Sequence, residues 1–457
     1  MMSDCTLSIC MPPVLLRLLH TLEAAGYPAY LVGGSLRDAL RGVPPHDFDV
    51  TTPATPSQML AVFARAGLHT IETGLKHGTV TVMVEGEPIE CTTYRVESTY
   101  SDGRHPDAVC FTDRIADDLC RRDFTVNAMA CRLPDVGRSD FCCDRPLTVT
   151  VGRDAELVDL WEGRADLAAG VLRCVGDPQT RFEEDALRIL RCVRFAVQLG
   201  FEVEEQTRRA LKTCRERLAL VSRERCAAEW LRLLECGKPI GYGLELIRET
   251  NLWAYVLPEM PELPDALGML RAAALPPEAP LRIAALLHSA YNIYRKKTFQ
   301  PADISTVARH SCRTLKLSNA VTAQVAMYAA VPDEALPTDA TALRRLMARC
   351  GEKTEQMLLW WAISRMDAAE LPAGALPQEY HAALATCREI AQRGDCLNVA
   401  GLALDGRALV ALDLHGRQIG AAQAQLLEAV LQNPEINTPA ALTEIVLRAL
   451  KNGTLPQ

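Results

Sequence analysis

Residues 30–50, YLVGGSLRDALRGVPPHDFDV, constrain the fold more than any other stretch of the sequence. An apolar run, a Gly-Gly pair, a short amphipathic segment and a second apolar run predict a strand, a glycine turn, a helix and another strand. Asp47 and Asp49 are two residues apart in the second predicted strand, so their side chains point to one face. Paired carboxylates suit Mg²⁺, which proteins hold through one or two carboxylates together with substrate phosphates.

Gly33 and Gly34 lie where the first predicted strand meets the helix, and Arg37 follows within that helix. Because glycine leaves the backbone bare and a helix N-terminus presents unpaired N–H groups, this turn suits an anion such as a triphosphate. Each feature alone is common, and an Asp-x-Asp pair is more often a solvated strand end than a pair of metal ligands. Together, at this spacing, they predict a site for a nucleotide and magnesium.

The order Gly-Gly-x-x-Arg-Asp followed by Asp-x-Asp resembles the head of the polymerase-β-like nucleotidyltransferases. The longer sequence motif resembles their class II branch, which contains the CCA-adding enzymes and the bacterial poly(A) polymerases. The resemblance implies that Gly34 and Arg37 contact the incoming triphosphate and that Asp47 and Asp49 bind Mg²⁺.

Two alternating segments, residues 77–84 and 89–94, predict a pair of strands joined by a Glu-Gly-Glu turn. Glu90 lies in the second of these strands, where a glutamate is more often simply exposed. The family wording His-Gly-Thr-Val-Thr-Val, followed by Glu-x-Thr-Thr-x-Arg, is reproduced here through Arg95. The resemblance therefore makes Glu90 a third catalytic carboxylate of a two-metal phosphoryl-transfer site.

A polar segment rich in turn-forming residues, 97–118, predicts a mobile surface loop, and the block RRDFTVNA follows it. Arg121 and Arg122 are cations suited to a triphosphate, while Asp123 and Asn127 are suited to ribose hydroxyls. On the residues alone, Asp123 is equally well explained as the cap of a helix N-terminus. This block is nearly identical to the family motif Arg-Arg-Asp-Phe-Thr-x-Asn-Ala, and the resemblance favours nucleotide binding.

Residues 181–195, RFEEDALRILRCVRF, predict a helix whose apolar positions recur at helical spacing. Its polar face then carries Asp185, Arg188, Arg191 and Arg194. Asp185 and Arg188 are three residues apart, and such a pair most often forms an intrahelical salt bridge in solvent. The class II CCA-adding family carries the same Glu-Asp-x-x-Arg motif. The resemblance implies that this pair selects the base and that Arg191 and Arg194 lie near the nucleotide.

The base-selecting role has a chemical basis. Cytosine and adenine both present an exocyclic amine donor beside a ring-nitrogen acceptor, so one carboxylate and one guanidinium serve both bases. Uracil and guanine present a carbonyl and an N–H at these positions. They would place donor against donor and acceptor against acceptor, a mismatch that hydrogen-bonding sites reject strongly.

Length and composition complete the prediction. A chain of 457 residues that is 49% hydrophobic and 5% aromatic predicts several largely helical domains. Together with this composition, the resemblance implies an α+β protein with a polymerase-β-like nucleotidyltransferase head followed by an all-α neck, body and tail. The predicted boundaries are a head at 1–168 with an insertion at about 138–156, a base-recognising neck at 169–245, a body at 246–370 and a tRNA-binding tail at 371–457.

The net charge of −8 confines any nucleic-acid surface to local basic patches. The 17 cysteines show neither a Cys-x-x-Cys motif nor zinc-ligand spacing, which predicts free thiols. No segment has the length of a membrane span, so we predict a cytoplasmic protein that makes no contact with a membrane. The sequence gives no indication of the oligomeric state.

The resemblance implies an enzyme that adds C, C and A to the 3′ end of tRNA from CTP and ATP, with Mg²⁺ and without a template. The alternatives are an enzyme that adds only CC or only A, a poly(A) polymerase, and a non-catalytic RNA-binding protein on the same scaffold. The Glu-Thr-Gly-Leu-Lys-His-Gly-Thr wording from Glu72 favours the CCA branch. The polar loop at 97–106 weighs against an enzyme that adds only CC.

Overall fold

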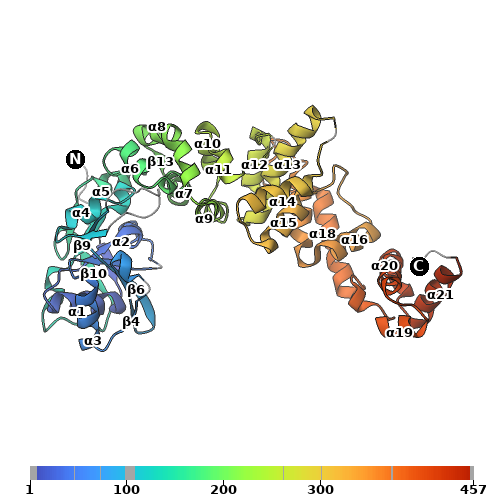
Figure 1. The fold of residues 1–457 in the computed structure, drawn as a ribbon, viewed down its shortest axis with the longest axis horizontal. Helices are drawn as coiled ribbons and strands as arrows, with labels where there is room; N and C mark the ends of the chain where they lie inside the picture. Colours follow the sequence, from blue (N-terminus) through green and yellow to red (C-terminus); the bar gives the residue numbers. More distant parts are fainter. Residues whose placement is uncertain are drawn as a thin grey trace. The chain divides into compact units, whose positions relative to one another are not determined.

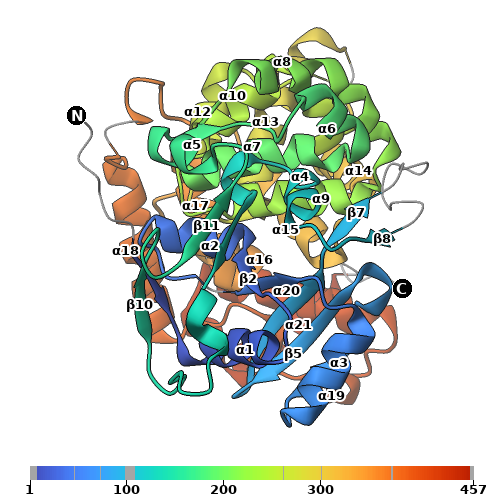
Figure 2. The same cartoon turned by 90° about the vertical axis from the view of Figure 1, so that its left-hand side faces the viewer.

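The computed structural model describes residues 8–45, 47–72, 74–97, 109–260, 262–299, 301–371 and 374–452. The chain divides into two compact units, Met1–Val256 and Leu257–Gln457. The first unit contains the described strands, and the described residues of the second form only helices (Figures 1 and 2). Residues 98–108 of the predicted mobile loop lie outside the described residues. The α+β prediction is confirmed.

A seven-stranded mixed sheet is the framework of the first unit, with strand order β11-β9-β2-β3-β6-β5-β4. Strands β3 and β6 are parallel, whereas the other neighbours are antiparallel. The strands are β2 (Tyr30–Val32), β3 (Asp49–Thr52), β4 (His69–Ile71), β5 (Thr79–Val84), β6 (Glu87–Thr93), β9 (Met129–Arg132) and β11 (Glu156–Asp159).

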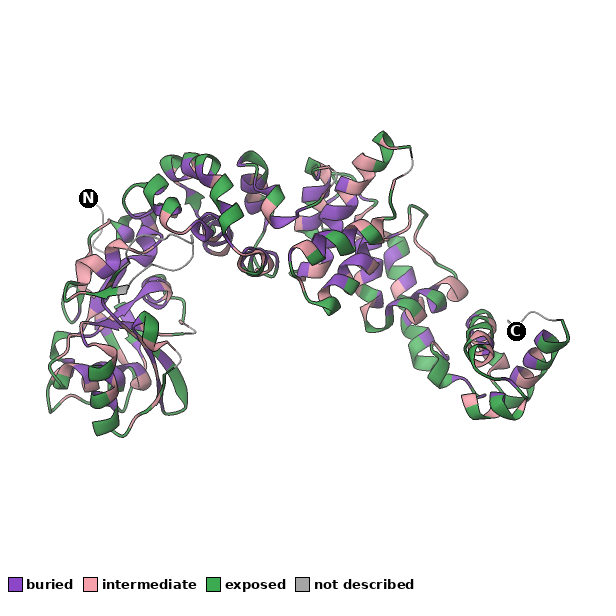
Figure 3. Cartoon of the chain, viewed as in Figure 1, coloured by how far each residue is buried: buried purple, intermediate pink, exposed green. Residues whose placement is uncertain are grey.

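Helices α1 (Pro13–Ala24) and α3 (Pro56–Arg65) both pack against β5. Side chains in β5 alternate between buried and half-buried, so Val80 and Val82 reach the core beneath these helices. Thr55 begins α3 with a capping box, in which its side chain accepts from the Gln58 backbone and the Gln58 side chain accepts from the Thr55 backbone. Both units contain buried residues, drawn in purple in Figure 3.

The predicted strand, glycine turn, helix and strand are confirmed as β2, α2 (Gly33–Leu40) and β3. One detail differs. Strand β3 begins at Asp49, so Asp47 lies in the bend before it and not within the strand as predicted. Pro44 and Pro45 precede this bend, and their fixed φ favours a turn or loop over a strand on this approach to β3.

The predicted insertion at 138–156 contains β10 (Leu147–Thr150), which pairs antiparallel with β1 (Ser8–Met11). Two further pairs of strands form separate sheets. Strand β7 (Arg95–Glu97) pairs antiparallel with β8 (Val109–Phe111), and β12 (Val171–Leu172) pairs parallel with β13 (Glu202–Val203). Segment 97–118 therefore contains β8 and the start of a helix.

The remaining α-helices of the first unit, with the 3₁₀ turn η2, are α4 (Ile115–Cys120), η2 (Thr125–Asn127), α5 (Gly163–Ala169), α6 (Pro178–Glu184), α7 (Leu187–Leu199), α8 (Glu205–Cys214), α9 (Arg223–Leu234), α10 (Gly241–Glu249) and α11 (Trp253–Val256). Four of the eleven predicted nucleotide-binding residues lie in them: Asn127, Arg188, Arg191 and Arg194. The single helix predicted over 181–195 is wrong, because α6 ends before Asp185 and α7 begins after it. Asp185 is extended (φ −138°, ψ 103°), and its side chain accepts from the Leu187 N–H at 3.0 Å, a local bond that competes with helix formation.

The second unit contains α12 (Ala266–Ala274), α13 (Ala279–Lys297), α14 (Ile304–Thr314), α15 (Asn319–Ala329), α16 (Ala340–Cys350), α17 (Thr354–Ile363), α18 (Gln378–Arg393), α19 (Gly406–Ala411), α20 (Arg417–Gln432) and α21 (Pro439–Lys451). Side chains such as those of Asp265 and Thr438 cap helix N-termini. Leu409, Leu426 and Val446 join α19, α20 and α21 in a core cluster of their own. Among the described residues, no helix combines the length and apolar character needed to cross a membrane.

Candidate functional site

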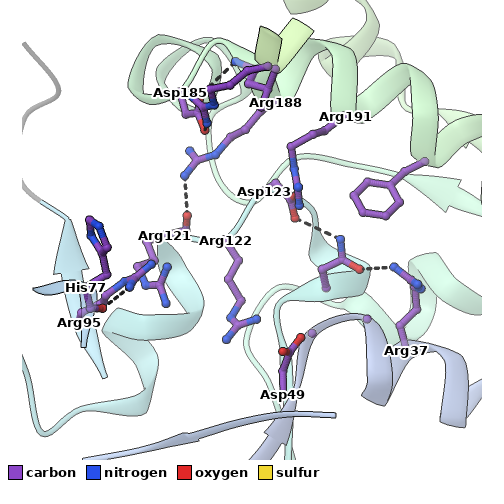
Figure 4. A pocket seen from close by; sticks show the side chains of 16 residues that line it. Arg37, Asp49, His77, Arg95, Arg121, Arg122, Asp123, Asp185, Arg188 and Arg191 are labelled. Carbon is purple, nitrogen blue, oxygen red and sulfur yellow. Dashed lines mark hydrogen bonds and ion pairs between the residues drawn. The ribbon is translucent and has the colours of Figure 1, made fainter. Parts of the chain in front are cut away.

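A cavity of about 600 Å³ opens in the first unit where the β2–α2 turn, β3, α4, η2 and the α6–α9 region meet (Figure 4). Eleven of the predicted site residues line it: Gly33, Gly34, Arg37, Asp49, Arg121, Arg122, Asp123, Asn127, Asp185, Arg188 and Arg191. Its lining contains seven arginines and three aspartates, an excess of positive charge in an acidic chain. The cavity is therefore suited to a polyanion.

The glycine turn brings the backbone close to charged side chains. Gly33 has φ +70°, in the left-handed region. A Cβ atom on Gly33 would lie 3.2 Å from Asp49 Oδ2 and 3.3 Å from Arg122 Nη1. Figure 4 shows Arg122 reaching toward Asp49 at the foot of the cavity. Only glycine combines this backbone angle with this close approach.

We expect Gly33→Ala to destabilise the first unit by about 1–2 kcal/mol, because a left-handed residue with a Cβ is strained. Gly34→Ala is the matched control. Gly34 has no positive φ, and its added Cβ would meet Arg37 Nη2 at an ordinary 3.5 Å. Urea unfolding followed by circular dichroism measures both variants. Equal losses of stability would show that the Gly33 conformation is not the constraint.

Asp49 and Glu90 are register partners in the parallel strands β3 and β6, so their side chains lie side by side on one face of the sheet. Burial raises the pKa of Asp49; the Arg122 guanidinium opposes this shift, while the charges of Glu90 and Asp47 add to it. Glu90 and Asp47 do not line the cavity of Figure 4, and Asp47 lines a separate cavity beside Phe48. No three described His, Cys, Asp or Glu side chains are grouped closely enough to hold a metal ion alone.

Asp118 organises the two arginines of the RRDFTVNA block. Its buried carboxylate accepts from Arg121 Nη2 at 2.7 Å and from Arg122 Nη2 at 3.2 Å. Burial favours the neutral acid, but the two guanidinium groups prevail and hold the pKa of Asp118 below its ordinary value. Asp118 therefore presents both arginines to the cavity in fixed positions.

Asp123 is the centre of a buried polar network. Arg191 donates to its Oδ2 from Nε at 2.9 Å and from Nη2 at 2.6 Å, and Asn127 donates to its Oδ1 at 3.1 Å. Arg37 in turn donates to Asn127 Oδ1 at 2.7 Å. Despite burial, Arg191 lowers the pKa of Asp123 to about 2. The alternative role of Asp123 as a helix cap is wrong, since Phe124 occupies the N-cap position of η2.

Asp185 and Arg188 reach the same cavity from the break between α6 and α7 (Figure 4). Arg188 Nη1 donates to Glu184 Oε2 at 2.7 Å, and its Nη2 donates to the Arg121 carbonyl at 2.8 Å. The Arg188 guanidinium is therefore anchored to both sides of the cavity. Because Asp185 is outside the helix, the two side chains do not share a helical face.

Arg194 does not line the cavity. It is buried against α9, where its Nε donates to Glu229 Oε2 at 2.5 Å, and its Nη1 donates to Gln198 at 2.6 Å. Its guanidinium lies 4.0 Å from the centre of the Phe195 ring, which also contacts Arg37 and Arg191. Arg194 thus supports Phe195 from behind the cavity wall.

Comparison with known proteins identifies the family. A family model described as the poly(A) polymerase head domain matches residues 29–173, and one described as the "probable RNA and SrmB-binding site of polymerase A" matches 200–263. A curated CCA-adding enzyme of Lactobacillus helveticus is 34% identical over 430 residues, covering 93% of this chain and 94% of the relative. The chain belongs to the family of CCA-adding enzymes.

Other relatives of this CCA-adding family member agree. A CCA-adding enzyme of Lactiplantibacillus plantarum is 42% identical over 254 residues, 56% of this chain and 55% of the relative. The chain matches only about half the length of such relatives. A crystal structure of the Bacillus stearothermophilus CCA-adding enzyme in complex with CTP is 28% identical, with a TM-score of 0.71, and covers 97% of this chain and 100% of that chain.

Sequence reasoning missed several residues that line or support the cavity of this CCA-adding family member. Asp118 was detectable, because its carboxylate precedes Arg121 and Arg122 at spacings of three and four residues. Phe195 follows Arg191 at helical spacing, which places both on one face. His77 and Arg225 carry no comparable local signal, since other elements bring them to the cavity.

Proposed function

We propose that this protein completes the 3′ end of tRNA by adding C, C and A from CTP and ATP without a nucleic-acid template. The observation that carries the proposal is the single cavity that joins the glycine turn and Asp49 to the pair Asp185 and Arg188. The end with the glycine turn and Asp49 has the groups needed to bind a triphosphate and to catalyse its reaction. The other end has the chemistry to select a base.

The triphosphate lies against the backbone of Gly33 and Gly34 in this proposal, and Arg37, Arg121 and Arg122 supply charge-assisted hydrogen bonds. Asp118 keeps the last two arginines in place. Asp123 and Asn127 already bond to each other and to arginines, yet carboxylate and amide oxygens retain further lone pairs for ribose hydroxyls. The network thus aligns the sugar between the phosphates and the base.

Magnesium is the cofactor that fits the carboxylates. Asp47 and Asp49, with Glu90 as a further carboxylate, would hold it together with the nucleotide phosphates, and the repulsion between Asp49 and its two acidic neighbours favours a bound cation. When bound, Mg²⁺ supplies positive charge that activates the tRNA 3′-hydroxyl and stabilises the departing pyrophosphate. Arg122 adds charge beside Asp49 on the triphosphate side.

Asp185 and Arg188 select the base in this proposal. The carboxylate accepts from the exocyclic amine of cytosine or adenine, and the guanidinium donates to the adjacent ring nitrogen. Arg188 is anchored to Glu184 and to the Arg121 carbonyl, so it is oriented before the nucleotide arrives. A preoriented pair rejects uracil and guanine, whose polar groups are reversed.

The RNA partner is tRNA, and its contacts lie on the helical part of the chain in this proposal. The match over residues 200–263 to a model described as an RNA-binding site supports this assignment. An acidic protein that reads RNA by shape needs basic residues only where phosphates approach. Processing of tRNA would place the enzyme in the cytoplasm.

Nucleotide incorporation tests the proposal. Purified protein with Mg²⁺ is offered three tRNA transcripts, ending before CCA, after C and after CC, with each labelled nucleotide alone and with CTP and ATP together. We expect completion of CCA, no further growth, and refusal of UTP and GTP. Long A tails would indicate a poly(A) polymerase, addition of only CC or only A a partial enzyme, and RNA binding without incorporation a non-catalytic protein.

A further inference from the structure

A second arginine, Arg225, lies beside Asp185 in the nucleotide cavity. It belongs to α9, and its Nη2 donates to Asp185 Oδ2 over 3.4 Å. Both residues line the cavity, although 40 positions separate them in the sequence. Helix α9 packs on α7, the helix that carries Arg188, so the contact depends on how the helices pack together.

Two contacts determine the orientation of the Asp185 carboxylate. Asp185 is in the extended break between α6 and α7, where no helical geometry directs its side chain. The Leu187 N–H donates to Oδ1 at 3.0 Å, and Arg225 donates to Oδ2. Because each carboxylate oxygen accepts about two hydrogen bonds, both oxygens can still accept from a nucleotide.

The contacts of Arg225 differ from those of a structural arginine. Arg194, on the neighbouring helix, donates to two acceptors at 2.5 and 2.6 Å. Arg225 makes one long contact, and its Nη1 is buried without a hydrogen-bond partner among the described residues. A buried donor without a partner is unfavourable for stability. Its place at the cavity wall is explained if the nucleotide site uses this guanidinium.

We propose that Arg225 is a specificity-determining positioning residue that holds the Asp185 carboxylate ready for the exocyclic amine of cytosine or adenine. The inference rests on the proposed function. Without Arg225, the carboxylate keeps only the Leu187 N–H and turns about its Cβ–Cγ bond. CTP and ATP then lose a well-directed hydrogen bond to the carboxylate. UTP and GTP no longer place a carbonyl oxygen against a fixed carboxylate, so they are rejected less strongly. Selectivity therefore falls more than nucleotide binding.

The test compares Arg225→Gln with wild type by the ratio of kcat/KM values for a correct and an incorrect nucleotide. On the tRNA transcript that ends before CCA, CTP is compared with UTP. On the transcript that ends after CC, ATP is compared with GTP. We expect both ratios to fall at least about tenfold, the usual scale for one hydrogen bond to a charged group. Arg225→Lys, which restores a cation near Asp185, is expected to recover part of each ratio. Arg153→Gln, an exposed arginine of the 138–156 insertion paired with Asp154, is the matched control and leaves both ratios unchanged.

The outcomes separate this inference from the proposed function. If wild type selects C and A but Arg225→Gln lowers kcat/KM equally for all four nucleotides, Arg225 makes only a structural contact between helices and the inference is wrong. If Arg225→Gln does not fold, the ratios of Arg225→Lys decide, and unchanged ratios overturn the inference. If wild type itself incorporates neither C nor A, the proposed function fails first.

Discussion

Replacing Asp49 by Asn is expected to reduce nucleotide addition about 10³-fold while CTP and ATP still bind. The variant removes a carboxylate that the proposed Mg²⁺ needs, and the electrostatic contribution of such a metal is several kcal/mol, with each 1.36 kcal/mol corresponding to tenfold in rate. Nucleotide binding persists because the glycine turn and the cavity arginines remain. The effect should therefore appear in kcat more than in KM.

Single-turnover incorporation on a tRNA ending before CCA measures this loss, and equilibrium binding of CTP measures what remains. Glu87→Gln, a carboxylate in the same strand as Glu90 but outside the cavity of Figure 4, is the control and should retain full activity. The melting temperature of Asp49→Asn should not fall, because burial and acidic neighbours already disfavour the charge of Asp49. Retention of normal activity in Asp49→Asn would exclude this carboxylate from catalysis.

Asp123→Ala is expected to destabilise the first unit by about 3 kcal/mol. The substitution breaks a buried ion pair and leaves Arg191 and Asn127 without their shared acceptor, and removing one partner of a buried pair typically costs about 3–5 kcal/mol. Urea unfolding is the measurement. The control is Glu205→Ala, which breaks an exposed helix pair with Arg209 and should cost at most about 0.5 kcal/mol. Equal costs would show that the Asp123 network does not stabilise the fold.

The pH dependence of stability provides a second measurement on Asp123. Its pKa in the folded protein is about 2, against an ordinary value of 3.8. A depressed carboxyl pKa contributes stability that is present above the ordinary value and is lost as the pH falls toward the folded value. The difference corresponds to about 2 kcal/mol. Wild type should lose this stability on acidification between these two values, and Asp123→Ala should not show that component.

Local sequence patterns were sufficient for the framework around the cavity. The Gly-Gly pair and the alternation of apolar residues depend on neighbours in the chain, and the corresponding β2, α2 and β3 are observed. The same holds for the hairpin of β5 and β6. Backbone conformation and side-chain period act over a few residues, so the sequence carries them directly.

The helix at residues 181–195 shows where local reasoning stops. Its apolar period is helical on both sides of Asp185, yet one side-chain bond to the Leu187 N–H interrupts it. Arg194 follows Arg191 at helical spacing, which predicted that it reaches the same site. Glu229 on another helix instead holds its guanidinium away from the cavity. A pattern along one helix does not indicate which face another helix will cover.

The sequence by itself determined the α+β class, the order of elements in the head, and the chemical types that a nucleotide site needs, because these follow from short-range periodicity and from wording shared with a family. Only the tertiary structure decided which charges meet. Asp123 joins Arg191 to Asn127, and Arg225 reaches Asp185. The Arg191 and Arg225 contacts join side chains 68 and 40 positions apart, and the packing of helices and sheet, which has no local signature, brings them within hydrogen-bonding distance.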